Sequence, residues 1–334
     1  MRTRAGLVAA FFALAASSAY PNGKVEIQGY AEYRIGPALV VDGQRVVADD
    51  DTEFKGGKRR GLSQVPLGYE VKVKGSRRAD GSILATKVES KPNGTAMFEP
   101  DVVAATNEIE RLWVQAGAMY SEGPRGRRET VGEIVEEGPD VARVRSIMAR
   151  LVPPYVDASK LRVRVVDTDE WNAAAMGNGA IWVYRGLLEE LSDDELAIIL
   201  GHELAHYTHE HSRRGAKKAM WGQLVGLAGM VGSETIDNRA GRNAAALGTL
   251  LSVTAWQSGY SRDLEDQADR VGLRYAREGG FDVNQGPVLW KKFRKKYGED
   301  SAMTNFLFGS HSRPSDRIRN IERELALNYR NETH

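Results

Sequence analysis

The spacing of apolar residues changes near residue 95, and this change constrains the fold more than any other feature of the sequence. Before it, apolar and polar residues alternate in short runs such as Val25–Tyr30 and Tyr69–Gly75. Alternation with a period of two is typical of strands that bury one face. Beyond Pro100 apolar residues recur at every third or fourth position, which is the spacing of helices. We therefore predict an α+β protein with a strand-rich first part and a mainly helical second part that contains a small sheet.

The first part, residues 22–95, is expected to form five or so short strands. Asp42-Gly43 and Asp80-Gly81 interrupt the alternating runs, and Asp-Gly between such runs indicates a hairpin. This pattern favours a small all-β domain, an OB-like barrel. The segment from Ser90 to Thr95 has the composition of a linker to the second part, residues 100–330.

Charge and cysteine content exclude several classes of function. The 334 residues carry 46 Lys and Arg against 45 Asp and Glu, a net charge of +1, and no Cys. The balanced charge gives no attraction to nucleic acid, so we expect no nucleic-acid partner and interpret the barrel as a spacer or docking module. Without Cys there can be no disulfide, thiolate-bound zinc or thiol nucleophile. Any metal must be held by Asp, Glu or the six His.

The N-terminus has the pattern of a secretory signal peptide. Met1-Arg-Thr-Arg4 precedes an apolar run from Ala5 to Ala16, and Ser17-Ser-Ala19 offers small residues for cleavage. We expect cleavage near Ala19 and a mature protein that is exported, and periplasmic in a Gram-negative host. The alternative interpretation is a buried first helix.

Two later uncharged stretches fall short of a membrane span. Residues 219–233 are too short and rich in Gly, and residues 243–261 contain Asn, Thr, Ser and Gln. A spanning helix needs about 20 mainly apolar residues. Core helices are expected here. The alternatives for residues 219–256 are a lid over the active site or a contact with a membrane surface or an apolar partner.

Several elements of the second part can be placed from local patterns. Apolar residues at helical spacing predict a helix over 131–151, and alternation predicts strands at 161–166 and 180–184. Ser192-Asp-Asp-Glu195 is a capping box that opens a helix.

That helix continues into Gly201-His-Glu-Leu-Ala-His206. Residues four apart share one face of a helix, so His202 and His206 can direct two imidazoles at one ion. A catalytic zinc site needs a third protein ligand and a water, whose proton a neighbouring carboxylate such as Glu203 can take. The alternative is a pair of helical histidines with ordinary hydrogen bonds.

A second motif, Glu265 and Asp269, supports a metal site at His202 and His206. Glu265 and Asp269 also lie four apart within a helical pattern, while Ala268 and Gly272 on the neighbouring stripe allow close approach of another helix. Glu265 can supply the third zinc ligand. Asp269 can accept the ring N–H of a ligand histidine and so fix its tautomer. The alternative is an exposed acidic helix whose charges Arg262 and Arg270 balance.

Taken together, residues 100–330 resemble the zinc peptidase family that includes the CAAX prenyl proteases, the HtpX-type heat-shock peptidases and the BepA-type periplasmic peptidases. The resemblance implies a gluzincin-type peptidase domain with one zinc ion on His202, His206 and Glu265, and Glu203 as general base. Five stretches occur in family order: Asn172–Ala175 with Gly179–Val183, Asp194–Leu196, Gly201–His206, Glu265–Asp269 and Phe308–Ile318.

The sequence departs from the family pattern in two places. His311 is followed by Ser312 where the family has Pro, and Glu210 precedes His211 where the family often has Arg. We interpret the second departure as peripheral. We expect His311 to donate a hydrogen bond to the oxyanion of the tetrahedral intermediate. The alternative is that His311 caps the segment Phe306–Ser310 or packs beside Arg317.

The remaining histidines are expected to be solvated. His209 and His211 follow the zinc motif in a stretch rich in Lys and Arg, near the negative end of the helix dipole. An adventitious second metal at His209 is the alternative, and His334 is terminal.

These features predict an exported zinc endopeptidase acting on proteins or peptides, with a role in envelope protein quality control. We expect residues 177–184 to be an edge strand to which a substrate adds, with Asn172, Gly179 and Ala180 in contact with it. The alternative is a chaperone or assembly factor whose peptidase activity is slow or secondary. Peripheral contact with a membrane or with the outer-membrane assembly machinery is compatible with both.

Overall fold

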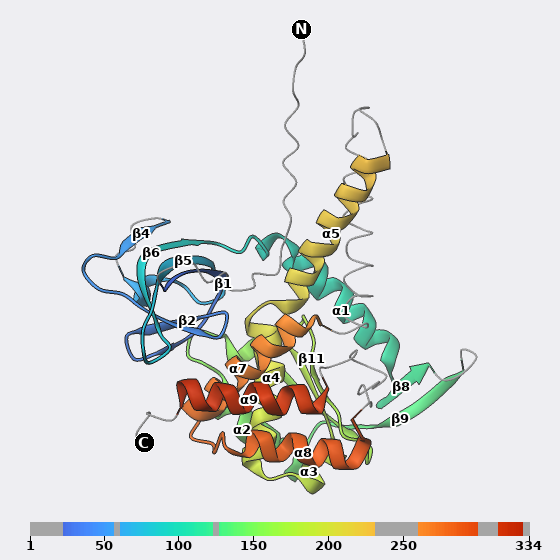
Figure 1. Ribbon diagram of the computed structural model, residues 1–334. Coiled ribbons are helices and arrows are strands. Elements are labelled where there is room, and N and C mark those ends of the chain that lie inside the picture. Colours follow the sequence, from blue (N-terminus) through green and yellow to red (C-terminus); the bar gives the residue numbers. More distant parts are fainter. Residues whose placement is uncertain (1–22, 57–60, 123–126, 231–259, 300–312, 330–334) are drawn as a thin grey trace. The chain divides into compact units, whose positions relative to one another are not determined.

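The computed structural model describes residues 23–56, 61–122, 127–230, 260–299 and 313–329 (Figure 1). The chain divides into two compact units, Met1–Pro92 and Asn93–His334. This boundary lies within the segment expected to be a linker. The α+β class is confirmed, since the first unit is built on strands and the second combines helices with a second sheet.

The first unit contains one six-stranded sheet with the order β3-β2-β1-β5-β6-β4. β3 makes a second pairing, parallel to β6, that extends over only two residue pairs. Because this contact is so short, the sheet curls toward itself without closing evenly. The strands are β1 (Lys24–Ile35), β2 (Ala38–Val41), β3 (Gln44–Val47), β4 (Glu53–Lys55), β5 (Glu70–Arg77) and β6 (Ile83–Lys91).

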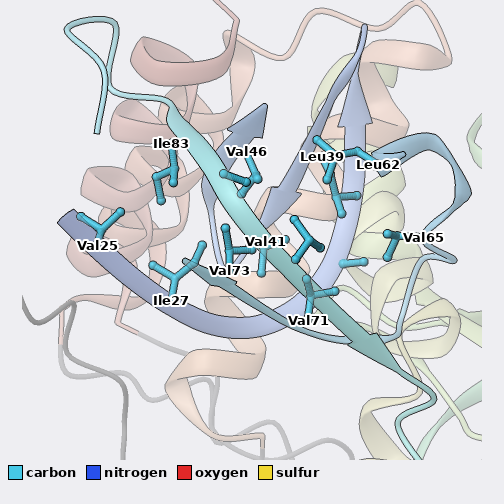
Figure 2. Packing of buried hydrophobic residues seen from close by; sticks show 13 residues of the cluster. Val25, Ile27, Leu39, Val41, Val46, Leu62, Val65, Val71, Val73 and Ile83 are labelled. Carbon is cyan, nitrogen blue, oxygen red and sulfur yellow. The ribbon is translucent and has the colours of Figure 1, made fainter. Parts of the chain in front are cut away.

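The hairpin between β2 and β3 forms where Asp42-Gly43 predicts it. Both residues have positive φ, 50° for Asp42 and 67° for Gly43, as a two-residue type I′ turn requires. The alternating residues of the strands point inward and form a continuous apolar core (Figure 2). Its labelled members are Val25, Ile27, Leu39, Val41, Val46, Leu62, Val65, Val71, Val73 and Ile83.

The second unit contains a six-stranded sheet with the order β11-β12-β10-β9-β8-β7. Its strands are β7 (Val114–Gln115), β8 (Ala118–Glu122), β9 (Arg128–Val135), β10 (Arg162–Asp167), β11 (Ala173–Ala175) and β12 (Ala180–Tyr184). The helices are α1 (Glu99–Trp113), α2 (Pro139–Leu151), α3 (Arg185–Glu190), α4 (Asp193–Thr208), α5 (His211–Met230), α7 (Arg262–Glu278), α8 (Gln285–Tyr297) and α9 (Pro314–Asn328).

Two expectations for this unit are wrong. Residues 131–135 belong to strand β9, and the helix begins only at Pro139. Gly138, with φ of 110°, separates the two elements, and Pro139 suits the first turn of a helix.

The segment 177–184 is not an edge strand either, because β12 pairs with β10 on one side and β11 on the other. Among the described strands, β11 lies at the edge of the sheet beside β12, and β7 lies at the other edge.

Helix α4 lies at the centre of the second unit. It begins at the predicted capping box, in which the Ser192 hydroxyl accepts the amide of Glu195 and the Glu195 side chain accepts the amide of Ser192. The helix is buried from Glu195 to His206. It contacts β11, α2, α5, α7 and α8, and its interface with α7 is the most extensive between two elements of the described chain.

The α4–α7 interface depends on two glycines. A Cβ atom on Gly201 would lie 2.6 Å from the carbonyl oxygen of Gly272, and a Cβ on Gly272 would lie 2.5 Å from the amide of His202. The two backbones therefore touch directly, as expected from the small residue Gly272 on the helix face beside Glu265 and Asp269. This contact sets the separation of the helices that carry the two motifs.

No helix among the described residues is both long and apolar enough to cross a bilayer. Several expectations concern residues outside the described ranges, namely the signal peptide at 1–19, His311, His334 and most of the 219–256 stretch.

We predict that Gly272→Ala lowers the free energy of unfolding by about 1–3 kcal/mol, as overpacking of a dense interior typically does. The new methyl group meets backbone atoms, which cannot rotate away. Chemical denaturation of the purified protein measures the change. Gly215→Ala in α5 is the matched control: its Cβ enters open space, so this variant should be stabilised by about 0.5–1 kcal/mol. Equal stability of Gly272→Ala and the wild type would contradict the close crossing.

Candidate metal centre

The three predicted metal ligands converge in the structure. His202 and His206 come from consecutive turns of α4, and Glu265 comes from the first turn of α7. The two Nε2 atoms lie 3.1 Å apart. The Glu265 carboxylate oxygens lie 3.4 Å from Nε2 of His202 and 3.5 Å from Nε2 of His206. All three side chains are buried. They are the single group of this kind among the described residues, and His209 is not part of it.

The arrangement fits a zinc ion. Zinc–nitrogen bonds of about 2.0–2.1 Å with tetrahedral angles place two ligand atoms about 3.3 Å apart. The 3.1 Å between the two nitrogens is close to that value, and each oxygen of Glu265 lies at a similar distance from one of them, 3.4 Å for Oε2 to His202 and 3.5 Å for Oε1 to His206. Two nitrogens and one carboxylate are also the donor set of a common class of catalytic zinc site, with a fourth position left for water.

Glu203 lies beside these ligands and is held in place by the sheet. One carboxylate oxygen accepts the backbone amide of Ala175, at 3.0 Å, and the other lies 4.0 Å from Nε2 of His202. Ala175 ends β11, the edge strand that packs against α4. The carboxylate is therefore fixed by backbone at the border between the sheet and the ligand group.

Asp269 lies where the sequence predicts it. Its carboxylate is 2.9 Å from Nδ1 of His202, the ring nitrogen that faces away from the other ligands. Burial opposes ionisation of Asp269, yet Arg317 and His202 hold the pKa of its carboxyl below the usual value. Burial and Arg317 lower the pKa of His202, but its hydrogen bonds to Asp269 and Glu265 outweigh them and raise that pKa to about 9.

Arg317 is also part of the site, a placement that we did not predict from the sequence. Its guanidinium pairs with the Asp269 carboxylate and lies 3.6 Å from the ring centre of Trp290. The side chain is 2% exposed. A signal was present in the sequence: Arg317 stands three residues after Pro314 and four before Ile321, on the buried stripe of α9. An arginine on an apolar stripe needs a buried anion.

The expectation that His209 and His211 are solvated is wrong. Both are buried, His211 completely. His211 Nδ1 lies 2.8 Å from Nδ1 of the ligand His206, and its Nε2 lies 3.0 Å from the amide oxygen of Gln267. Burial above all, with His206 and Arg214 adding to it, keeps the pKa of His211 well below its usual value. His211 is therefore in contact with the ligand group, in surroundings that disfavour the charged form of its imidazole.

The Glu210 departure is not peripheral either. Glu210 has φ of 57°, which ends α4 and turns the chain back so that His211 faces His206. Its carboxylate accepts hydrogen bonds from Asn93 and Thr95 in the linker, and Arg213 binds the other oxygen at 3.0 Å. This turn explains why helical spacing alone did not place His211.

A pocket opens beside Glu203 and His202. Its walls are mostly apolar, with Asn172 and Arg317 as polar members, and the other lining residues are Ala173, Leu187, Ile199, Trp290 and Phe293. Asn172 is therefore near the site. Gly179 and Ala180 do not line this pocket, and their backbone groups pair within the sheet with Arg162 and Met176.

Two family models match the chain. The model described as "Peptidase family M48" matches residues 140–325, more than half of the chain, and includes all residues of the ligand group. The model described as "Domain of unknown function (DUF5666)" matches residues 35–89, within the first unit.

Curated relatives agree with the first match. The chain is 35% identical over 136 residues to "Metalloendopeptidase OMA1, mitochondrial" of Bos taurus, covering 39% of this chain and 25% of that protein. It is 27% identical over 179 residues to "Metalloprotease YcaL" of Escherichia coli, covering 54% and 68%. It is 31% identical over 161 residues to the "Putative beta-barrel assembly-enhancing protease" of Vibrio cholerae, covering 47% and 33%. The chain thus spans about a quarter to a third of the bovine and Vibrio proteins.

The matched region contains the His-Glu-x-x-His helix, the second acidic helix and the edge strand that fixes Glu203, in the order and geometry described above. This chain belongs to peptidase family M48, a family of zinc metallopeptidases.

Proposed function

We propose that this chain is a zinc-dependent endopeptidase with one ion held by His202, His206 and Glu265. The single observation that carries the proposal is the convergence of these three side chains next to a carboxylate, Glu203, that the sheet holds in place. A binding protein has no need of such a carboxylate. This favours the enzyme over the alternative of a chaperone with secondary peptidase activity.

The residues divide the chemistry among them. When bound, zinc supplies a Lewis acid that polarises the scissile carbonyl and makes a water acidic. Glu203 takes the proton of the attacking water and returns it to the leaving amine. Asp269 accepts the Nδ1–H of His202 and thereby keeps Nε2 available as a ligand. Arg317 compensates the buried charge of Asp269.

The substrate is proposed to be an extended protein or peptide chain. The edge position of the second sheet belongs to β11, adjacent to Glu203, so β11 replaces residues 177–184 as the strand to which a substrate adds. Asn172, directly before β11, lines the pocket beside Glu203 and is kept as a substrate contact. His311 lies outside the described residues, so its role as a donor to the oxyanion stays a prediction from the sequence.

The biological setting is proposed from the sequence and from the relatives. The N-terminal pattern of residues 1–19 supports export, and cleavage near Ala19 would leave a periplasmic protein in a Gram-negative host. The name of the Vibrio relative refers to β-barrel assembly, which supports a role in envelope protein quality control, with contacts to a membrane or to the outer-membrane assembly machinery. The first unit then serves as a barrel-like spacer or docking module, and the 219–256 stretch as a lid or a membrane contact.

Replacing Glu203 by Gln tests the proposed base. The variant should retain zinc and the wild-type fold but lose peptidase activity by a factor of about 10²–10⁴ or more, because the amide cannot take a proton. Cleavage of casein by zinc-loaded protein measures the loss, with metal analysis as the control. Cleavage at the wild-type rate would exclude Glu203 as the base.

Replacing the acidic residues of α7 tests the metal site. Glu265→Ala should lower zinc affinity most, because it removes a ligand. Asp269→Ala should lower it by roughly 10–100-fold, as is usual for partners of ligating histidines. Competition with a chromophoric chelator gives both affinities. If Glu265→Ala bound zinc as tightly as the wild type, the third ligand would have to be another residue.

Zinc affinity should rise with pH. Because the pKa of His202 is raised to about 9 in the metal-free protein, this imidazole holds a proton at neutral pH that zinc must displace. Release of one proton makes the affinity rise about tenfold per pH unit below the pKa and level off above it. Chelator competition between pH 6.5 and 8.5 checks the slope, and an affinity independent of pH in this interval would contradict it.

A further inference from the structure

The two histidines of the ligand group have different partners at their outer nitrogens. His202 Nδ1 faces the carboxylate of Asp269, at 2.9 Å, and a guanidinium nitrogen of Arg317 lies 2.8 Å from the same atom. His206 Nδ1 instead faces the imidazole of His211, at 2.8 Å. His211 Nε2 in turn faces the Gln267 side chain at 3.0 Å, and Arg214 reaches the same Gln267 atom, Oε1. His206, His211 and Gln267 are all buried.

The directions of the hydrogen bonds that connect Arg214, Gln267, His211 and His206 can be worked out one after another, starting from Arg214. A guanidinium can only donate, so the Gln267 atom that faces it must be the amide oxygen. An amide oxygen can only accept, so Nε2 of His211 carries a hydrogen. A second hydrogen on Nδ1 would make His211 a fully buried cation whose partners, another imidazole and the amide oxygen shared with Arg214, include no anion. Nδ1 of His211 is therefore the acceptor.

The same logic then fixes the tautomer of His206. Since His211 Nδ1 accepts, Nδ1 of His206 must carry the hydrogen, and the lone pair of His206 lies on Nε2. That is the atom directed at His202 Nε2 and Glu265. The ring of His206 is also stacked on Tyr260 with centroids 4.1 Å apart, which holds its plane.

We infer that Arg214, Gln267 and His211 are positioning residues that preset His206 as an Nε2 metal ligand. They act through a neutral imidazole, whereas Asp269 acts on His202 as an anion. The inference rests on the proposed zinc site and adds to it a second, uncharged support for a ligand.

The experiment measures zinc binding by the full-length protein in competition with a chromophoric chelator. His211→Phe keeps a ring but removes the acceptor, and should weaken zinc binding roughly 10–100-fold, as the loss of a ligand's orienting partner usually does. In His211→Asn the acceptor Oδ1 is bonded to Cγ, as Nδ1 is in histidine. This variant should therefore restore most of the zinc affinity. His209→Phe is the matched control, because His209 is equally buried and bonds to Thr208.

A double-mutant cycle separates orientation from mere packing. Gln267→Leu removes the amide oxygen and should also weaken zinc binding, since His211 is then free to adopt the other tautomer. In a protein that already carries His211→Phe, the same change should have no further effect on zinc affinity. The visible spectrum of the Co²⁺-substituted protein should change in His211→Phe and return to that of the wild type in His211→Asn.

The outcomes distinguish this inference from the proposed function. Wild-type affinity in His211→Phe, no recovery in His211→Asn relative to His211→Phe, or additive effects in the cycle would each overturn the positioning role while leaving the zinc site intact. A wild-type protein that binds no zinc would overturn the proposed function, and the inference with it. If His211→Phe fails to fold, the zinc affinities of His211→Asn and Gln267→Leu are compared with that of the wild type. Weaker binding in Gln267→Leu than in His211→Asn supports the positioning role, and wild-type affinity in Gln267→Leu overturns it.

Discussion

Direct backbone contact between Gly201 and Gly272 is the constraint on which the metal centre depends. Two ligands stand on α4 and the third on α7, so the separation of these helices decides whether three side chains can reach one ion. A methyl group at either glycine would approach backbone atoms within 2.6 Å. Close-packed interiors relax little, and a wider crossing would move Glu265 away from both histidines. The metal centre therefore requires that residues 201 and 272 have no side chain.

The close crossing of α4 and α7 buries the carboxylate of Asp269, and the surrounding residues compensate its charge. An isolated carboxylate in a buried site is costly, whereas a paired and hydrogen-bonded one is tolerated. Asp269 meets both requirements, because His202 donates to it and Arg317 pairs with it. Arg317 itself lies over the face of Trp290, where the aromatic ring favours a cation. Through Trp290 and Arg317, helices α8 and α9 therefore help to hold His202, which lies on α4.

The turn at Glu210 connects this centre to the beginning of the second unit. A non-glycine residue with positive φ is unfavourable by about 1 kcal/mol or more, and side-chain hydrogen bonds can offset that cost. Here the carboxylate binds Asn93, Thr95 and Arg213. The same turn brings His211 against His206. One residue therefore anchors the linker and places the orienting histidine.

Local patterns in the sequence were sufficient for the capping box at Ser192 and the Asp42-Gly43 hairpin, because each depends on residues a few positions apart. The likeness to zinc peptidases needed only the order of several short motifs along the chain. Helical spacing likewise put His202 and His206 on one face. The sequence could not place His211, Arg317 or the edge strand. His211 depends on a left-handed turn that breaks the helical register, Arg317 on the docking of α9 against α7, and the edge position of β11 on the order in which β11 joins β12. These are long-range relations, and packing rather than local preference decides them.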